Sequence, residues 1–291
     1  MKFRKLVWPY CIIKGKDFRL RDIDPGDGAS ADLKARSEEF LADGVKRLSA
    51  LQEKLYAQGQ WSLLLIFQAM DAAGKDSAIK HVLSGINPQG CEVYSFKAPS
   101  TKELGHDFLW RTTQCLPERG RIGIFNRSYY EEVLVVRVHP EFLRGQKIPQ
   151  KLVTDDIWHE RFEDIRAFER HLARSGTVVL KFFLHVSKGE QKRRFLARLD
   201  EPDKNWKFSA ADVGERSLWD KYMKAYEDMV RHTATPEAPW YVVPADHKWF
   251  SRMVVATAII DKLESLKLSF PEMDRARQAQ LRQARRLLGR R

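Results

Sequence analysis

The stretch that decides the fold reads Leu63-Leu64-Leu65-Ile66-Phe67-Gln68-Ala69-Met70-Asp71-Ala72-Ala73-Gly74-Lys75-Asp76-Ser77. Its first five residues are a continuous apolar run, which is typical of a strand buried on both faces of a parallel sheet. A loop of small residues follows, and a helical segment then runs to about Ser84. A loop between a buried strand and a helix presents backbone N–H groups and the positive end of a helix dipole. The stretch therefore predicts an anion-binding loop.

The rest of the chain alternates between strand-like and helix-like segments. Further strands are predicted at residues 92–96, 121–125, 177–184 and 240–243, and further helices at 37–56, 101–116, 155–174 and 248–266. This alternation predicts an α/β fold, in which helices on both faces sandwich a parallel sheet. Ligands of such sheets bind at the carboxyl ends of the strands. The candidate site therefore lies just after Phe67, Phe125 and Leu184.

The loop after the first strand departs twice from the generic phosphate-loop pattern G-x-x-x-x-G-K-[ST]. Ala69 stands where the first glycine belongs, and Asp76 stands where the pattern has a Mg²⁺-binding hydroxyl. The alternative is an ordinary strand-to-helix turn with a chance Gly-Lys pair. Asp71 argues against it, because a carboxylate inside a phosphate loop repels phosphate unless a metal or a proton lies between them. The candidate phosphate-binding residues here are Ala72, Ala73, Gly74, Lys75, Asp76 and Ser77.

A second polar segment, Asn126-Arg127-Ser128-Tyr129-Tyr130-Glu131, follows the predicted strand at residues 121–125. Arg127 has the geometry to bind phosphate through two parallel hydrogen bonds. Asn126 and Glu131 supply oxygen atoms suited to Mg²⁺ or to its bound waters. Taken alone, the segment is equally compatible with the polar start of a helix.

A basic segment follows the strand predicted at residues 177–184. Ser187 and Glu190 fit a capping box, which predicts that a helix begins there. Arg194 and Arg198 are four residues apart and share one face of that helix, and Lys207 follows further on. Mobile arginines often neutralise charge during phosphoryl transfer. The alternative is a solvated helix face, because most charge runs are only that.

Composition bounds the class of protein without choosing a function. The 291 residues are 43% hydrophobic and 31% charged, which is typical of a globular chain. The net charge of +12 is compatible with nucleic acid, an anionic membrane surface or a phosphate-rich substrate. No apolar run reaches the length of a membrane span, and we expect a cytoplasmic protein with no membrane partner. The three widely spaced cysteines predict reduced thiols.

The chain divides into three parts on these patterns. We expect an N-terminal arm at residues 1–35, a phosphate-loop domain at 36–270 with a lid at about 187–212, and a basic helical tail at 271–291. The tail from residue 274 onward carries seven arginines and one aspartate. We interpret it as a solvated or partner-binding helix without a catalytic role.

Several of these motifs, in this order, resemble the polyphosphate kinase 2 family. The likeness covers about residues 30–268, and the stretches that carry it are residues 67–76, 85–90, 125–132, 198–207 and 235–243. The resemblance implies phosphoryl transfer between inorganic polyphosphate and nucleotides with Mg²⁺. It also implies a P-loop kinase-like fold with a helical lid, similar to thymidylate kinases, and a homo-oligomer, either a dimer or a tetramer.

The resemblance also implies roles for individual residues. Asp71 and Lys75 match the Walker A pair, Arg127 matches a phosphate-binding position, and Arg194 and Arg198 match lid arginines that close on the chain. The catalytic set is then Asp71, Lys75, Asn126, Arg127 and Glu131, with Asp71 and Glu131 as metal ligands. Many members of the family have aspartate where Asn126 stands. Asn126 with Glu131 is similar to the subgroup that phosphorylates both AMP and ADP.

We therefore expect a polyphosphate:nucleotide phosphotransferase acting on ADP and AMP, with guanine nucleotides left open beside adenine nucleotides. Two alternatives are weighed against it. An ATP-dependent nucleoside monophosphate kinase would be indifferent to polyphosphate. A nucleic-acid-binding protein with a degenerate phosphate loop would show salt-dependent binding and no turnover. The second alternative requires all the matching motifs to be coincidental, so we expect no nucleic-acid partner.

Overall fold

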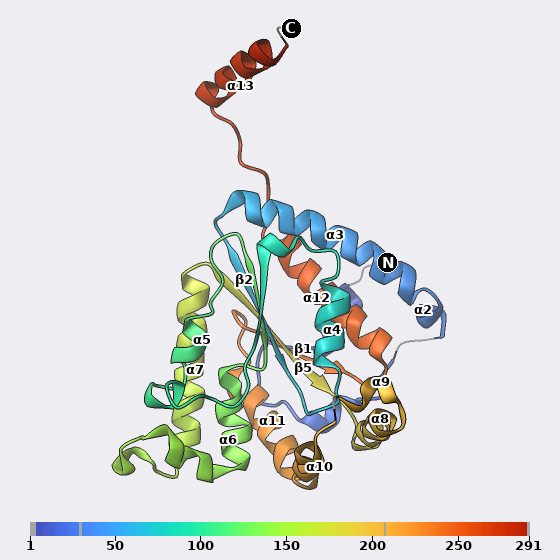
Figure 1. Cartoon of the computed structure of the whole chain (residues 1–291), viewed down its shortest axis with the longest axis vertical. Coiled ribbons are helices and arrows are strands. Elements are labelled where there is room, and N and C mark those ends of the chain that lie inside the picture. Colours follow the sequence, from blue (N-terminus) through green and yellow to red (C-terminus); the bar gives the residue numbers. More distant parts are fainter. Residues whose placement is uncertain (1–3, 29–30, 207, 290–291) are drawn as a thin grey trace.

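The centre of the molecule is a six-stranded sheet with the strand order β1-β6-β5-β2-β4-β3 (Figure 1). The computed structural model describes residues 4–28, 31–206 and 208–289. The strands are β1 (Cys11–Ile12), β2 (Ser62–Gln68), β3 (Cys91–Ser95), β4 (Ile122–Asn126), β5 (Thr177–His185) and β6 (Trp240–Pro244). Five of them run parallel, which confirms the predicted α/β class.

The sheet contains one strand, β1, that the sequence analysis did not predict. It comes from the N-terminal arm and pairs antiparallel with β6, with Cys11 opposite Tyr241 and Ile12 opposite Trp240. A two-residue strand has no periodicity of its own that a sequence pattern reveals. Its pairing depends on β6, which lies more than two hundred residues further along the chain.

Helices cover the two faces of the sheet, as Figure 1 shows. On one face α3 (Ser37–Gln58) and α4 (Lys75–Val82) pack against α12 (Lys248–Ser265), and on the other α7 (Ile157–Arg174) packs against α11 (Trp219–Thr233). The shorter helices are α1 (Arg4–Val7), α2 (Ala31–Ala35), α5 (Trp110–Thr113) and α6 (Val135–Val138). The predicted lid consists of α8 (Lys188–Asp200), α9 (Pro202–Asn205) and α10 (Ala210–Ser217).

The single helix predicted at residues 101–116 is wrong. That segment contains only the 3-10 turn η4 (Glu103–Gly105) and α5. His106 has an extended backbone conformation, and the Asp107 carboxylate accepts a hydrogen bond from the Leu109 N–H at 2.9 Å. Asp side chains that bond nearby backbone N–H groups compete with helix continuation, and this is the physical reason for the break.

The core is continuous through the central strands. Leu63 through Phe67 on β2 are 0% exposed, as the uninterrupted apolar run predicts. A buried lysine, Lys181 on β5, donates to the Glu169 carboxylate at 2.6 Å, the Tyr130 hydroxyl at 3.0 Å and the Thr233 carbonyl at 2.8 Å. Glu169 also accepts from the Tyr129 hydroxyl. A buried charge is tolerated only when it is paired, so these groups must stay together in the folded protein. The network therefore holds the segment after β4 against β5 and α7.

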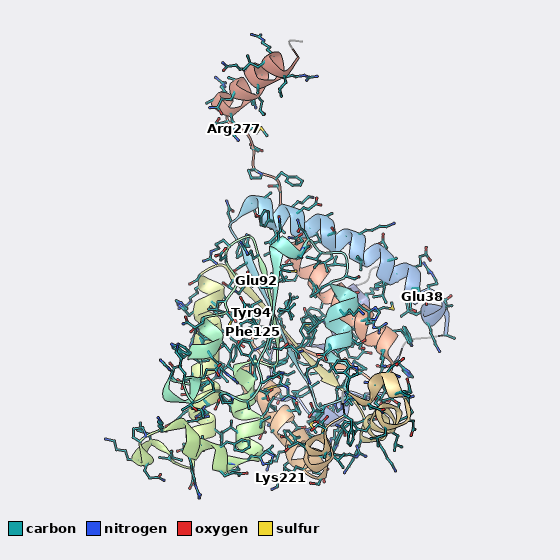
Figure 2. The ribbon with its side chains drawn as sticks, in the orientation of Figure 1. Glu38, Glu92, Tyr94, Phe125, Lys221 and Arg277 are labelled. Carbon is teal, nitrogen blue, oxygen red and sulfur yellow. The ribbon has the colours of Figure 1, made fainter. Side chains whose placement is uncertain are left out.

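The C-terminal helix α13 (Arg275–Leu288) lies apart from this core. Figure 2 shows side chains projecting from all around this helix, with Arg277 at the end nearer the body of the molecule. None of its described residues is buried. Among the described residues, no helix is long and apolar enough to cross a membrane.

Candidate active site

The loop between β2 and α4 turns tightly at the carboxyl edge of the sheet. Ala72 has a φ of +63° and Gly74 a φ of +104°, and the Ala73 N–H donates to the Met70 carbonyl at 3.2 Å. A non-glycine residue at positive φ is uncommon and marks a local constraint. The first N–H groups of α4 have no acceptor within the helix, which leaves them able to donate to an anion at this edge.

Lys75 lies at the start of α4, beneath the loop. Its ammonium donates to the Ala69 carbonyl at 2.9 Å, and the residue is 9% exposed. Burial lowers the pKa of Lys75, while the nearby Asp71 carboxylate acts in the opposite direction. Ala69 has no positive φ, so the position where the generic pattern has glycine accepts alanine here. The ammonium is therefore held in the loop, close to where phosphate oxygens would bind.

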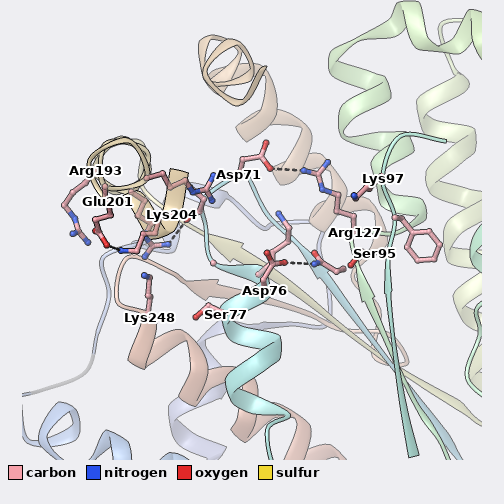
Figure 3. A pocket seen from close by; sticks show the side chains of 18 of the residues that line it. Asp71, Asp76, Ser77, Ser95, Lys97, Arg127, Arg193, Glu201, Lys204 and Lys248 are labelled. Atoms are coloured by element: carbon pink, nitrogen blue, oxygen red, sulfur yellow. Dashed lines mark hydrogen bonds and ion pairs between the residues drawn. The ribbon is translucent and has the colours of Figure 1, made fainter. Parts of the chain in front are cut away.

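Arg127, directly after β4, faces the loop and joins it to the neighbouring strand. Its guanidinium lies 2.8 Å from the Asp71 carboxylate and 3.6 Å from that of Glu131 (Figure 3). The side chain is 37% exposed. The Glu131 carboxylate, followed by that of Asp71, raises the pKa of Arg127, and burial opposes this effect. Burial raises the pKa of Glu131, and the charges of Arg127 and Lys75 counteract it.

Asn126, the last residue of β4, binds the phosphate-loop helix. Its side-chain amide donates to the Asp76 carboxylate at 2.7 Å. One residue further along α4, the Ser77 hydroxyl accepts from the Arg252 guanidinium at 2.8 Å. Asp76, which replaces the hydroxyl of the generic pattern, thus connects α4 to β4 in this structure.

A cavity of about 640 Å³ lies over the loop. Eight lysines and arginines line it against three aspartates and glutamates. The cationic lining residues are Lys75, Lys97, Arg127, Arg193, Arg194, Arg198, Lys204 and Lys248. In Figure 3, Lys97 lies beside Arg127, whereas Arg193, Lys204 and Lys248 lie on the opposite side. Such an excess of positive charge in a concave site favours a polyanionic ligand.

The structure brings most of the predicted site residues to this cavity. Asp71, Ala72, Gly74, Asp76, Ser77 and Asn126 line it together with the predicted cations. Ala73 and Glu131 lie behind the lining: Ala73 is 3% exposed, and Glu131 reaches the site through Arg127. Lys207 lies outside the described residues.

A phosphate loop, a facing arginine and a helical lid thus meet in one polycationic cavity. The family model for polyphosphate kinase 2 matches residues 32–271. The chain belongs to the polyphosphate kinase 2 family. It is 54% identical to an ADP-polyphosphate phosphotransferase of Rhodopseudomonas palustris, over 95% of this chain and 99% of the relative. It is 45% identical to an AMP/ADP-polyphosphate phosphotransferase of Meiothermus ruber, over 89% and 93%.

A solved structure of the same family supports this assignment. The crystal structure of polyphosphate kinase 2 from Arthrobacter aurescens TC1 superposes with a TM-score of 0.84 at 41% identity, covering 93% of this chain and 94% of that chain. The predicted P-loop kinase-like α/β fold is therefore confirmed.

Four cationic residues of the cavity were not among the predicted site residues: Lys97, Arg193, Lys204 and Lys248. Lys97 follows β3 and Lys248 follows β6, so both stand at strand ends that were not singled out, while Arg193 lies next to Arg194. Lys97 and Lys248 could have been found by the rule already applied to the other strands, that ligands bind at the carboxyl ends of the strands of a parallel sheet. Burial, and then Arg194, Lys204 and Arg252, lower the pKa of Lys248, so this wall concentrates positive charge.

Proposed function

We propose that this chain transfers phosphoryl groups from inorganic polyphosphate to ADP and to AMP. The observation that carries the proposal is the polycationic cavity over the loop that holds Lys75, in a chain of the polyphosphate kinase 2 family. Relatives named as ADP-polyphosphate and AMP/ADP-polyphosphate phosphotransferases support both acceptors. A homo-oligomer and the use of guanine nucleotides stay predictions.

The chemistry asks the protein mainly for positioning and charge neutralisation. A nucleotide phosphate is already anionic at neutral pH, so its oxygen attacks a terminal phosphorus of polyphosphate without a strong general base. The bond to the bridging oxygen breaks, and the shortened polyphosphate leaves as an anion. Lys75 and Arg127 line the cavity and would offset the charge on the transferred group. Such preorganised contacts account for most of the rate enhancement in phosphoryl transfer.

The donor set suits Mg²⁺ bound jointly by protein and substrate. Among the described residues, no group of three or more His, Cys, Asp or Glu side chains converges as a metal site. Mg²⁺ usually keeps several waters and binds one or two carboxylates plus substrate phosphates, so a sparse protein set fits it. Asp71 lines the cavity and Glu131 lies behind Arg127. Asp71 would hold the ion, with Glu131 acting through water, and the bound ion would neutralise charge on the phosphates.

The acceptor choice is proposed to depend on Asn126. Its amide engages Asp76 at 2.7 Å, a contact in which an aspartate would repel. An Asn126→Asp variant therefore rearranges the edge of the loop where an acceptor phosphate would approach. We expect its ratio of AMP to ADP turnover to differ from that of the wild type about tenfold, since losing the hydrogen bond to the Asp76 carboxylate and gaining repulsion is worth about 1–2 kcal/mol.

The deciding experiment measures ATP formation from AMP, and separately from ADP, with long-chain polyphosphate and Mg²⁺ as the only additions. ATP from both acceptors is the expected result. ATP from ADP alone would overturn the proposed use of AMP while keeping the kinase. No ATP from either, with a folded protein, would contradict the proposal and favour an ATP-dependent nucleoside monophosphate kinase, which the same assay detects when ATP replaces polyphosphate.

A further inference from the structure

The first lid helix holds three consecutive backbone carbonyls of the phosphate loop. The Gln191 side-chain amide donates to the Asp71 carbonyl at 3.0 Å. The Arg194 guanidinium donates to the carbonyls of Ala72 at 3.0 Å and Ala73 at 2.7 Å. Gln191 is 1% exposed and Arg194 is 8% exposed. Both side chains are therefore buried where they connect α8 to the loop.

Arg194 has no hydrogen-bond donor left for a substrate in this arrangement. A guanidinium carries five N–H groups. Besides the two loop carbonyls, they reach the Glu190 carboxylate at 2.7 Å and the carbonyls of Ala245 at 2.6 Å and Asp246 at 3.1 Å. These five acceptors come from three segments: the phosphate loop, α8 itself and the loop after β6. Arg194 thus differs from the mobile lid arginine that the family resemblance implies.

The base of α8 is anchored by further contacts. The Ser187 N–H donates to the Asp246 carboxylate at 2.8 Å, and the Ser187 hydroxyl caps the helix by accepting from the Glu190 N–H at 3.1 Å. The Gln191 side-chain oxygen accepts from the Arg216 guanidinium at 2.8 Å, which fixes the orientation of its amide. The start of the lid is therefore part of the rigid scaffold around the loop.

We propose that Gln191 and Arg194 are positioning residues that set the conformation of the phosphate loop for phosphoryl transfer. A trans peptide directs its C=O and N–H groups in opposite directions. Binding of the Asp71 and Ala73 carbonyls to α8 therefore turns the N–H groups of Ala72 and Gly74 away from α8, where they serve phosphate oxygens. The same ties hold Ala72 at its φ of +63°, a conformation that alanine disfavours. The inference rests on the proposed function for the identity of the anion.

Two variants separate positioning from charge. Arg194→Lys keeps the positive charge but loses the five-donor fork, and Gln191→Leu removes the amide without changing any charge. We expect both to lower kcat for ATP formation at least about tenfold, with KM for polyphosphate and for ADP within about threefold of the wild type. The matched control is Lys192→Ala, an exposed position between them, which should retain both constants.

Steady-state kinetics has a clear opposing outcome. If Arg194 is instead a polyphosphate ligand, Arg194→Lys retains most activity and Arg194→Ala raises KM for polyphosphate more than about tenfold with little change in kcat. Either result overturns the inference. Adding Ala72→Gly to Arg194→Lys should recover part of the lost kcat, because glycine adopts positive φ without steric cost. Failure of glycine to recover any activity would contradict the role assigned to the Ala72 conformation.

Hydrogen–deuterium exchange of the ligand-free protein tests the inference independently of turnover. Backbone amides at residues 70–75 should exchange faster in Arg194→Lys and Gln191→Leu, while those of β2 and β5 should match the wild type. Unchanged exchange in the loop would contradict the inference. A wild-type protein without polyphosphate turnover but with this exchange pattern would reject the proposed function and keep the inference, whereas an active wild type with unaffected variants would reject only the inference.

Discussion

Arg127 and Arg194 lie on two walls of the same cavity and are held in opposite ways. Arg127 is 37% exposed and is held by two carboxylates, those of Asp71 and Glu131. Arg194 is buried and is held mainly by four backbone carbonyls. Carboxylate partners can exchange for phosphate or be neutralised by a metal, whereas bonds to buried carbonyls cost free energy to break without replacement. An arginine side chain is thus available to a substrate on one wall of the cavity, at Arg127, and is part of the scaffold on the other, at Arg194.

The largest effect is expected at Lys75, between the two walls. Lys75→Ala removes the ammonium held at the Ala69 carbonyl and should lower kcat about 10³-fold or more, as for other preorganised charge clamps. The measurement is ATP formation from ADP and polyphosphate at saturation. Lys80→Ala, an exposed lysine further along α4, serves as the control. Wild-type turnover by a folded Lys75→Ala enzyme would remove the phosphate loop from the mechanism.

Arg127→Ala tests the wall of the cavity on which the arginine is held by exchangeable carboxylate partners. We expect kcat/KM for polyphosphate to fall about 10²-fold, with an increase in KM, because a charged contact to substrate is lost. This pattern contrasts with the kcat loss and constant KM predicted for Arg194→Lys. Identical changes of kcat and KM in the two variants would break the comparison, since both arginines would then act in the same way.

Asp71→Asn tests whether the carboxylate that holds Arg127 also serves a metal. The Mg²⁺ concentration for half-maximal activity should rise about 30-fold, in the range found when a group supporting a metal site is removed. The measurement is a Mg²⁺ titration at fixed polyphosphate and ADP. An Asp220→Asn variant, on α11 and exposed, should titrate like the wild type. A titration curve unchanged from wild type would assign Asp71 to Arg127 alone.

The smallest expected effect is a pH-dependent change in stability that arises at His185, close to the backbone carbonyls that hold Arg194. The His185 carbonyl accepts from the Ala245 N–H at 2.9 Å, next to the carbonyl that Arg194 binds, and burial lowers the pKa of His185 from 6.5 to about 4. The unfolded chain binds a proton at His185 more tightly than the folded protein does. The contribution of neutral His185 to folding stability is therefore fully present above pH 6.5 and is lost as the pH falls toward 4. Between pH 7 and 5.5 the free energy of unfolding should fall about 1 kcal/mol.

Denaturant unfolding at the two pH values measures this change. His185→Gln, which does not titrate, should show a smaller decrease between pH 7 and 5.5 than the wild type. An equal decrease in both proteins would show that other groups carry the pH dependence.

The loop that holds Lys75 and the facing strand end were predictable because their signals are local. The apolar run of β2, the Gly74-Lys75 pair and the Asn126-Arg127 pair each occupy consecutive positions, and parallel strands bring their carboxyl ends to one edge. The lid was predictable as a capped helix for the same reason, and the Ser187 cap forms as expected. Lys97 and Lys248 were not recognised, because each is a lone lysine without a surrounding motif.

The sequence by itself thus determined the α/β class and the family, and it located the loop that holds Asp71 and Lys75. Only the tertiary structure decided that Arg194 and Gln191 bind the loop backbone, that Asp76 pairs with Asn126, and that β1 completes the sheet. The physical reason is that a backbone carbonyl is the same acceptor in every residue. Residue types therefore cannot show which carbonyls a side chain will meet, and this depends on segments that folding brings together.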